Sequence, residues 1–224
     1  MRNLLRKELT LCTNPQVIIF CLFSCLVAIP SWPSVVAFVY VFSGIATIFP
    51  RALADQDLQY TAMLPIRKGD VVKGKTALIS VLELSSLIFS IPFALIKIYL
   101  ADPQTIAGDP AGEVYTLAVE PTMSVYGFVF LAFGVYNAVM LPWYYRNPAK
   151  VNWPLLWSML IGFLVLGLGA GAKALIYFKL GGDTGSLTYY LVEGGVLLAG
   201  FIFFVFLTIF GEKRAEKKFD KVDL

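Results

Sequence analysis

Long apolar runs separated by short charged segments constrain this sequence more than any other feature. A helix needs about 20 apolar residues to cross the hydrocarbon core of a bilayer, and about 17 to 25 are tolerated. Hydrophobic residues make up 58% of the chain, whereas soluble domains typically hold about 45 to 50% apolar residues. The sequence therefore predicts an all-α integral membrane protein with six transmembrane helices. The six runs are Pro15–Pro30, Ser34–Pro50, Thr76–Leu100, Ala118–Pro142, Trp153–Phe178 and Leu187–Phe210. The first two runs are short and could form a re-entrant pair, but two spans are favoured because the flanking Lys7 and Arg51 are charged and the turn between the runs is not.

The distribution of lysine and arginine predicts the orientation of these helices. Of the 18 basic residues, 15 lie in the N-terminal segment, in the second and fourth loops, and in the tail. Basic residues near helix ends stay on the cytosolic side, so both termini are expected in the cytosol. The other three, Lys97, Lys173 and Lys179, fall at outer helix ends, where a long side chain can reach the headgroups. Glu120 and Glu193 also lie near outer ends and are expected in water, where they could favour a cationic substrate.

A single transmembrane domain is expected over residues 1–224, with an interface helix at 1–14, six spans over 15–210 and a charged cytosolic tail at 211–224. In the first segment, apolar and basic residues fall on different helical faces, which is typical of an amphipathic helix lying in the membrane interface. A simple basic cap on the first span is the alternative. The tail is expected to be a solvated helical extension. The residues assigned to the interface helix are Leu4, Leu5, Arg6, Lys7, Glu8 and Leu9.

Composition excludes several classes of function. The chain contains no histidine, which removes histidine-based acid–base catalysis and the common histidine metal sites. Cys21 and Cys25 share a helix face, but without further ligands a structural role is expected, and no metal is predicted. The net charge of +3 is confined to segments between apolar runs, so no nucleic-acid partner is expected. The chain is not expected to be an enzyme.

Residues Gly69–Thr76 satisfy the phosphate-loop pattern GxxxxGK[ST] letter for letter. A phosphate loop binds nucleotide because a buried strand delivers a glycine-rich turn to the N-terminus of a helix. Here the following helix enters the bilayer, and the longest cytosolic segment, residues 51–75, is too short to complete a nucleotide-binding domain. The match is therefore interpreted as accidental, and no cofactor is expected in this chain.

The same cytosolic segment predicts a short helix that opens near Asp55 and Asp57 and stops before Pro65. It carries apolar side chains that so short a segment cannot bury by itself. They must contact either lipid headgroups or another protein, and the neighbouring acids favour a protein because an anionic membrane surface repels them.

Four stretches carry a resemblance to a known family. They are residues 4–9 (LLRKEL), 57–60 (DLQY), 63–75 (MLPIRKGDVVKGK) and 91–94 (IPFA). In these stretches the chain resembles ABC-2 type permeases, and within them the small permeases of phenol-soluble-modulin and related antimicrobial-peptide exporters. The resemblance covers the first hundred residues, and the remainder agrees only in the number of spans.

This resemblance implies the transmembrane subunit of an ABC exporter in the plasma membrane of a prokaryote. It implies that a separate ATPase subunit binds ATP and Mg²⁺, that a second permease chain, identical or different, completes the transporter, and that the substrate is an amphiphilic peptide or hydrophobic compound. It also implies that the short cytosolic helix is a coupling helix seated in a groove of the ATPase. The predicted ATPase-coupling residues are Asp57, Leu58, Gln59, Tyr60, Met63, Leu64, Arg67 and Lys68.

Within the spans, Glu83 is the strongest functional candidate, since an ionised side chain is costly in lipid and usually faces a cavity or a partner. A substrate contact and a structural bond to a neighbouring span both remain open. Small residues in the fifth run, including Gly162, Gly167, Gly169 and Gly171, predict close helix packing or dimerisation. Two other classes of function remain open: a stand-alone secondary transporter or channel, and a non-transporting toxin-immunity protein.

Overall fold

The computed structural model describes residues 15–29, 32–62, 66–100, 120–179 and 186–222. The predicted interface helix at 1–14, together with Met63 and Leu64, lies outside these residues. The described residues form helices joined by turns, with no strand among them. The elements are α2 (Pro15–Leu22), η1 (Phe23–Ala28), α3 (Ser34–Ala46), α4 (Ile48–Ala54), α5 (Asp57–Ala62), α6 (Lys68–Leu100), α8 (Met123–Tyr144), α9 (Asn152–Lys179) and α10 (Leu187–Phe219).

Five helices are long and apolar enough to cross a membrane, which confirms the predicted all-α membrane class. The chain is a multi-pass membrane protein by helix length and hydropathy. The first predicted span differs, because α2 and the 3₁₀ helix η1 together form a short apolar helix over Pro15–Ala28. At the rise of each helix type this segment is about 24 Å long, shorter than the hydrocarbon core of about 30 Å. The five long helices are Ser34–Ala54, Lys68–Ile98, Met123–Tyr144, Asn152–Ile176 and Leu187–Phe219.

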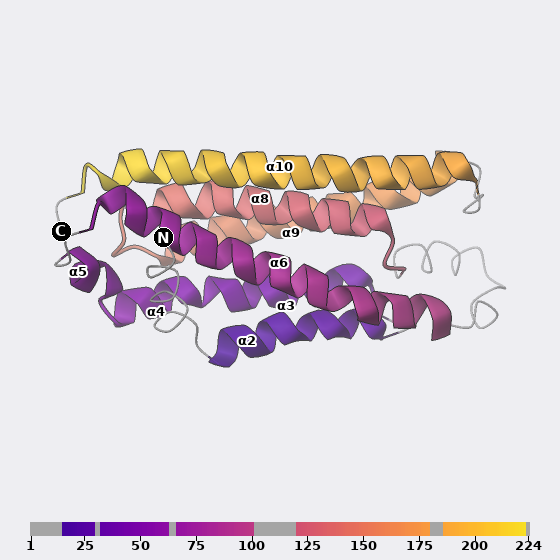
Figure 1. Cartoon of the computed structure of the whole chain (residues 1–224), viewed down its shortest axis with the longest axis horizontal. Helices are drawn as coiled ribbons and strands as arrows, with labels where there is room; N and C mark the ends of the chain where they lie inside the picture. Colours follow the sequence, from indigo (N-terminus) through magenta and orange to yellow (C-terminus); the bar gives the residue numbers. More distant parts are fainter. Residues whose placement is uncertain (1–14, 30–31, 63–65, 101–119, 180–185, 223–224) are drawn as a thin grey trace.

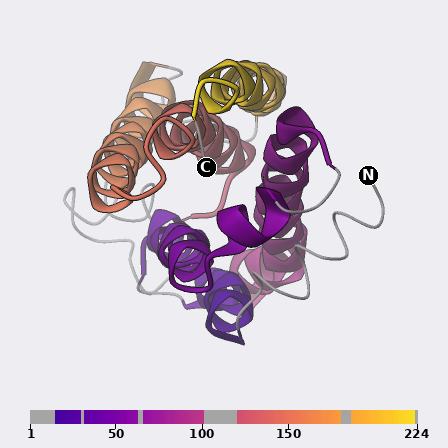
Figure 2. The same ribbon diagram turned by 90° about the vertical axis from the view of Figure 1, so that its left-hand side faces the viewer.

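The helices lie roughly parallel to one long axis and run alternately in opposite directions (Figure 1). Viewed from the end where α10 finishes, α8, α9 and α10 gather on one side, and α2 and α3 gather on the other (Figure 2). Among these helices, α8 packs most extensively against α10 and next against α9. The long helix α6 contacts α10 and α8 as well as α2, η1 and α3, so it joins the two groups.

An aromatic cluster fills the centre of the bundle. The ring centroid of Phe42 on α3 lies 4.7 Å from that of Phe133 and 5.4 Å from that of Tyr136, both on α8. Phe163 on α9 packs against Phe42 edge to face at 6.0 Å. Such pairs add about 0.5 to 1.5 kcal/mol each beyond their buried area. The cluster therefore links α3, α8 and α9 without any polar bond.

Close packing of α8 against α10 depends on glycine. A Cβ atom added to Gly200 would overlap the carbonyl oxygen of Gly127, and one added to Gly211 would lie 2.9 Å from the Cα of Ala138. Small residues are used in this way in membranes, where association relies on van der Waals packing. Only part of the fifth run packs closely. A Cβ added to Gly162 or Gly169 would meet the side chain of Phe42 or Phe128, whereas a Cβ on Gly167 or Gly171 would meet nothing within 4 Å.

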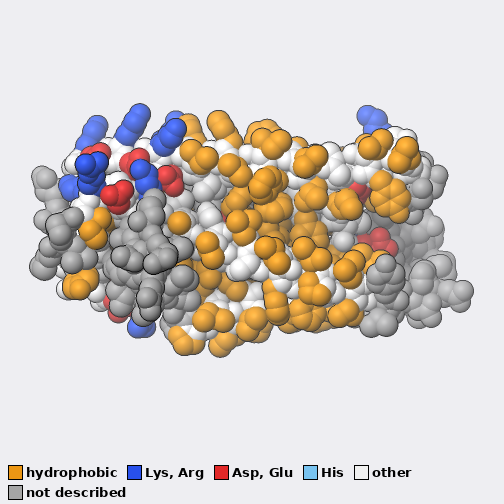
Figure 3. All heavy atoms as spheres, viewed as in Figure 1, with side chains coloured by type: hydrophobic (Ala, Val, Ile, Leu, Met, Phe, Trp, Pro, Cys, Tyr) orange, Lys and Arg blue, Asp and Glu red, His pale blue; other side chains and the backbone are white. Residues whose placement is uncertain are grey.

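The face seen in Figure 3 carries a broad apolar band, and most of its charged side chains gather at the end where α10 finishes, with a few at the opposite end. On α9, exposed leucines recur at mostly four-residue intervals and form one face of the helix. This face has the composition that lipid requires. Its leucines are Leu156, Leu160, Leu164, Leu168 and Leu175.

The charged tail is helical as predicted, but it is not simply solvated. Helix α10 continues without a break to Phe219, and Ala215 and Phe219 are buried. The ring of Phe219 packs against Tyr145 with centroids 5.0 Å apart, and Lys68 Nζ donates to the carbonyl oxygen of Val222 at 2.8 Å. Apolar residues spaced among the tail's charges give it a packing face, so residues 211–219 belong to the bundle.

Candidate functional site

A buried ion pair joins the short helix α5 to the long helix α6. Lys75 Nζ lies 2.7 Å from Asp57 Oδ2, and the two side chains are 0% and 5% exposed. Thr61 Oγ1 donates to the carbonyl oxygen of Asp57 at 2.6 Å and lies 3.4 Å from Asp57 Oδ1. Breaking a buried pair leaves an uncompensated charge and is strongly destabilising, so this contact fixes the position of α5 relative to α6.

The turn before α5 directs this helix across the charged end of the bundle, as seen in Figure 2. Gln56 has a φ of 52°, a left-handed conformation that costs a residue with a Cβ about 1 to 2 kcal/mol. Asp55, which ends α4, pairs with Arg51 at 2.7 Å on the exposed surface. The strained residue lies at the junction of α4 and α5.

The residues predicted to couple to an ATPase divide by their exposure. Asp57 and Leu58 are buried within the chain, whereas Gln59 and Tyr60 are exposed, Tyr60 by 57%. Arg67 is exposed. Lys68 is half-buried, where its ammonium group donates to the carbonyl oxygen of Val222 and lies 5.9 Å from the centre of the Phe219 ring. The free surface of the described part of this segment is therefore the face that carries Gln59 and Tyr60, while Asp57 holds the helix from behind.

Residues 69–76, which match the phosphate-loop pattern, lie inside α6. The N–H groups of Asp70 and Val71 donate to the carbonyl oxygen of Arg67, and the later N–H groups of the segment donate within the helix, so from Asp70 on the backbone is not open as it is in a phosphate loop. Lys75, at the position of the phosphate-binding lysine, is paired with Asp57.

Glu83 lies in the interior, where it joins three helices. Asn137 Nδ2, on α8, donates to Glu83 Oε2 at 2.9 Å and lies 3.3 Å from Thr208 Oγ1 on α10. Glu83 is 0% exposed and Asn137 1%. Three oxygen atoms here have no hydrogen-bond partner in the described part of the chain: Glu83 Oε1, Asn137 Oδ1 and Tyr136 OH. Such an arrangement can accept a proton or a cationic group, since a buried carboxyl group with a free oxygen is costly when unpaired.

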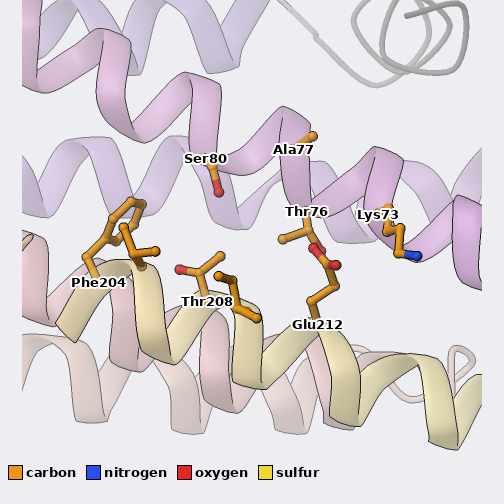
Figure 4. Close-up of a pocket in the computed structure, with 9 residues that line it drawn as sticks. Lys73, Thr76, Ala77, Ser80, Phe204, Thr208 and Glu212 are labelled. Carbon is orange, nitrogen blue, oxygen red and sulfur yellow. The ribbon is translucent and has the colours of Figure 1, made fainter. Parts of the chain in front are cut away.

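A groove of about 310 Å³ runs between α6 and α10 close to this network (Figure 4). Hydroxyl groups of Thr76, Ser80 and Thr208 line it beside the apolar walls, and Lys73 and Glu212 line it toward the charged end. Lys73 Nζ also lies 3.2 Å from Glu216 Oε1. Because Thr208 both lines the groove and contacts Asn137, the groove adjoins the Glu83 network.

The arrangement of this groove suits an amphiphile. Charged groups lie toward one end, apolar side chains such as Phe204 and Ile209 form the walls, and hydroxyl groups supply scattered hydrogen-bonding partners. A molecule with a polar head and an apolar body could satisfy both kinds of lining.

Three charged residues that the sequence analysis placed near outer helix ends are more enclosed than it indicated. Lys97 Nζ donates to the carbonyl oxygen of Trp32 at 2.8 Å, and Lys173 Nζ to that of Glu120 at 2.7 Å. Glu193 was expected in water, but it is 2% exposed and accepts hydrogen bonds from the backbone N–H and the hydroxyl of Ser124, both at 2.8 Å. Its carboxylate binds the N-terminal turn of α8, where an anion is favoured. Spacing alone gave no signal for this pairing, because it joins residues 69 positions apart.

Among the described residues, no group of three or more histidine, cysteine, aspartate or glutamate side chains is placed to hold a metal ion. No model of a known protein family matches the chain, and comparisons with curated proteins and with solved structures found no match. The fold and the site thus define a helical multi-pass membrane protein with a buried polar network.

Proposed function

We propose that this chain is the transmembrane subunit of an ABC exporter. In this proposal the segment Pro15–Ala28 completes a set of six spans, both termini face the cytosol, and the protein resides in the plasma membrane of a prokaryote. A separate ATPase subunit binds ATP and Mg²⁺ and hydrolyses ATP, and a second permease chain, identical or different, completes the translocation path. The transported molecule is an amphiphilic peptide or another hydrophobic compound.

The observation that carries the proposal is the ion pair between Asp57 and Lys75. It attaches a short helix at the charged end, with an exposed tyrosine and glutamine, to a helix long enough to cross the membrane. A force applied to the exposed face of α5 is then transmitted to α6 and not absorbed by a loose loop. This is the mechanical arrangement that a subunit driven by an external ATPase requires.

In the proposed cycle, closure of the ATPase on ATP displaces α5, and α6 moves with it. Helix α6 carries both Glu83 and one wall of the groove shared with α10. A shift of α6 relative to α10 therefore changes the groove and the Glu83 network together. Binding energy in the ATPase selects between two arrangements of these helices.

Co-purification of a tagged chain from its native membranes tests the proposal. We expect an ATPase subunit to co-purify with the wild-type chain, and the eluate to hydrolyse ATP. Tyr60→Asp should abolish the association while leaving membrane insertion intact, because it places a charge in the packed interface. Tyr60→Phe keeps the apolar ring and should retain the ATPase. Retention of the ATPase by Tyr60→Asp, or a wild-type chain that purifies without one, overturns the proposal.

The buried carboxyl group of Glu83 favours a second candidate, a stand-alone secondary transporter. Its unpartnered oxygen is the kind of site at which transporters bind a coupling ion. The purified chain in proteoliposomes distinguishes the two candidates. Uptake driven by an ion gradient in the absence of any ATPase supports this second candidate, and transport that requires both ATP and an added ATPase subunit supports the first.

A further inference from the structure

A second groove, of about 270 Å³, opens where α8, α9 and α10 meet near the charged end of the bundle. It combines two tryptophans and two basic side chains with small apolar walls, and no acidic residue lines it. The lining residues are Ala138, Val139, Pro142, Trp143, Trp157, Ile161, Arg214 and Lys218.

The positive charge of this groove is not neutralised within the described part of the chain. Arg214 and Lys218 lie one turn apart on α10, and the charged groups that act most strongly on Lys218 are Arg146 and Arg214. Helix α10 does carry acids, but Glu212 and Glu216 face the other way, toward Lys73 on α6. The groove therefore presents a concentrated positive potential to any ligand.

The aromatic residues indicate the depth of the groove in the membrane. Trp143 is in the last turn of α8 and Trp157 in the second turn of α9, and the two are 43% and 45% exposed. Tryptophan is enriched at the level of the lipid headgroups. The Arg214 guanidinium lies 4.1 Å from the centre of the Phe210 ring, so its charge lies against apolar surface, as expected at that level.

We infer that this groove binds an anionic phospholipid, with the phosphate of its headgroup at Arg214 and Lys218 and an acyl chain along the apolar walls. Guanidinium groups bind phosphate oxygens through charge-assisted hydrogen bonds. Basic pockets between transmembrane helices on the cytoplasmic side bind acidic lipid headgroups in the same way. The inference goes beyond the proposed function, because it holds for either transport mechanism.

The lining favours a lipid over a soluble anion or an acidic peptide. Trp157 and Ile161 belong to α9, whose neighbouring leucines Leu160 and Leu164 face outward, so the groove is continuous with the lipid-facing surface. A zwitterionic lipid would bring its own cation toward the two basic side chains, Arg214 and Lys218, and an anionic lipid would not. We therefore expect phosphatidylglycerol to bind more tightly than phosphatidylethanolamine.

Native mass spectrometry of the full chain in a nonionic detergent tests this. The probes are phosphatidylglycerol and phosphatidylethanolamine with identical acyl chains, mixed in equal amounts. The wild-type chain should retain phosphatidylglycerol preferentially, and the double variant Arg214→Gln/Lys218→Gln should lose about thirtyfold in that retention because two basic groups, each worth about 1 kcal/mol, are removed. The matched control, Lys213→Gln/Lys217→Gln, removes the same charge from the exposed face of the same turns and should behave as the wild type.

Three results overturn the inference: no preference for phosphatidylglycerol in the wild type, equal loss in the two double variants, or displacement of bound lipid by glycerol phosphate without acyl chains. A measurement that needs no variant covers the case in which a substitution prevents folding. In vesicles of fixed composition, bromine atoms placed on the acyl chains of phosphatidylglycerol should quench tryptophan fluorescence more than bromine on phosphatidylethanolamine. Equal quenching also contradicts the inference.

Discussion

Lys75 Nζ and Asp57 Oδ2 lie 2.7 Å apart with both side chains shielded from solvent, and this contact joins α5 to α6. A second ion pair in the same region, between Arg51 and Asp55, has the same length but exposes about half of each side chain. The two pairs therefore differ in environment and not in geometry. Charges removed from water interact strongly and are costly to separate, whereas exposed pairs are screened.

Removing one partner of the buried pair should destabilise the protein far more than removing one partner of the exposed pair. Lys75→Met removes the ammonium group that lies against the buried carboxylate of Asp57, with an expected loss of about 3 to 5 kcal/mol. Arg51→Gln should cost less than about 1 kcal/mol. Thermal unfolding of the purified chain in detergent measures both, and we expect a clearly lower Tm for Lys75→Met alone.

A double variant provides the control for this prediction. Asp57→Asn/Lys75→Met removes both charges, so it should recover much of the Tm that Lys75→Met loses. Equal losses for Lys75→Met and Arg51→Gln would show that the pair contributes nothing beyond an ordinary surface contact.

The Glu83 network predicts different outcomes for two substitutions at one position. Glu83→Gln keeps an oxygen that can accept the hydrogen bond from Asn137 Nδ2 and avoids the cost of burying a carboxylate, so the Tm should be unchanged or higher. Glu83→Ala leaves Asn137 with only its longer contact to Thr208 and opens a cavity, so stability should fall by about 1 to 3 kcal/mol.

Transport by the Glu83→Gln variant then separates the two roles left open for this residue. A purely structural carboxyl group can be replaced by the amide with little loss of transport. A group that binds a proton or a cationic substrate cannot, so a stable but inactive Glu83→Gln variant would assign Glu83 to the transport path.

Replacing Gln56 by glycine should stabilise the protein. Its φ of 52° is unfavourable for a residue with a Cβ but not for glycine. Gln56→Gly should therefore raise the free energy of unfolding by up to about 1 kcal/mol, less the greater entropy of glycine in the unfolded chain. Differential scanning fluorimetry compares this variant with Gln59→Gly, which lies inside α5 and should lower the Tm. A lower Tm for Gln56→Gly contradicts the interpretation of strain at this turn.

The sequence alone predicted the positions of the helices along the chain better than it predicted which residues of different helices contact each other. Apolar length identified the segments that became α3 with α4, α6, α8, α9 and α10, because membrane thickness sets a minimum length that few soluble helices reach. It showed that the first run is short, but it did not show that Phe23–Ala28 is a 3₁₀ helix, since hydropathy does not distinguish the rise of the two helix types.

For the candidate site, too, the sequence identified single residues but not the residues that contact them. The sequence singled out Glu83 because a carboxyl group in an apolar run is costly wherever it points. It could not identify Asn137 or Thr208 as its neighbours, because these lie 54 and 125 positions away and their polarity is unremarkable in a helix. It likewise placed Asp57 among the coupling residues without showing that its carboxylate faces Lys75, because which face of a short helix is covered depends on tertiary packing.

Two glycines on α10 should respond in opposite ways to the same substitution. Gly200→Ala puts a methyl group onto the carbonyl oxygen of Gly127, so α8 and α10 must separate and the Tm should fall. Gly195→Ala is the matched control: it lies on the same helix, and a Cβ there meets nothing within 4 Å. Since alanine is the better helix former by about 1 kcal/mol, Gly195→Ala should leave the Tm unchanged or raise it.

If both variants unfold at the wild-type temperature, the close approach of α8 and α10 at Gly127 does not stabilise the bundle. If both are lowered equally, a general requirement for glycine in α10 replaces the specific contact.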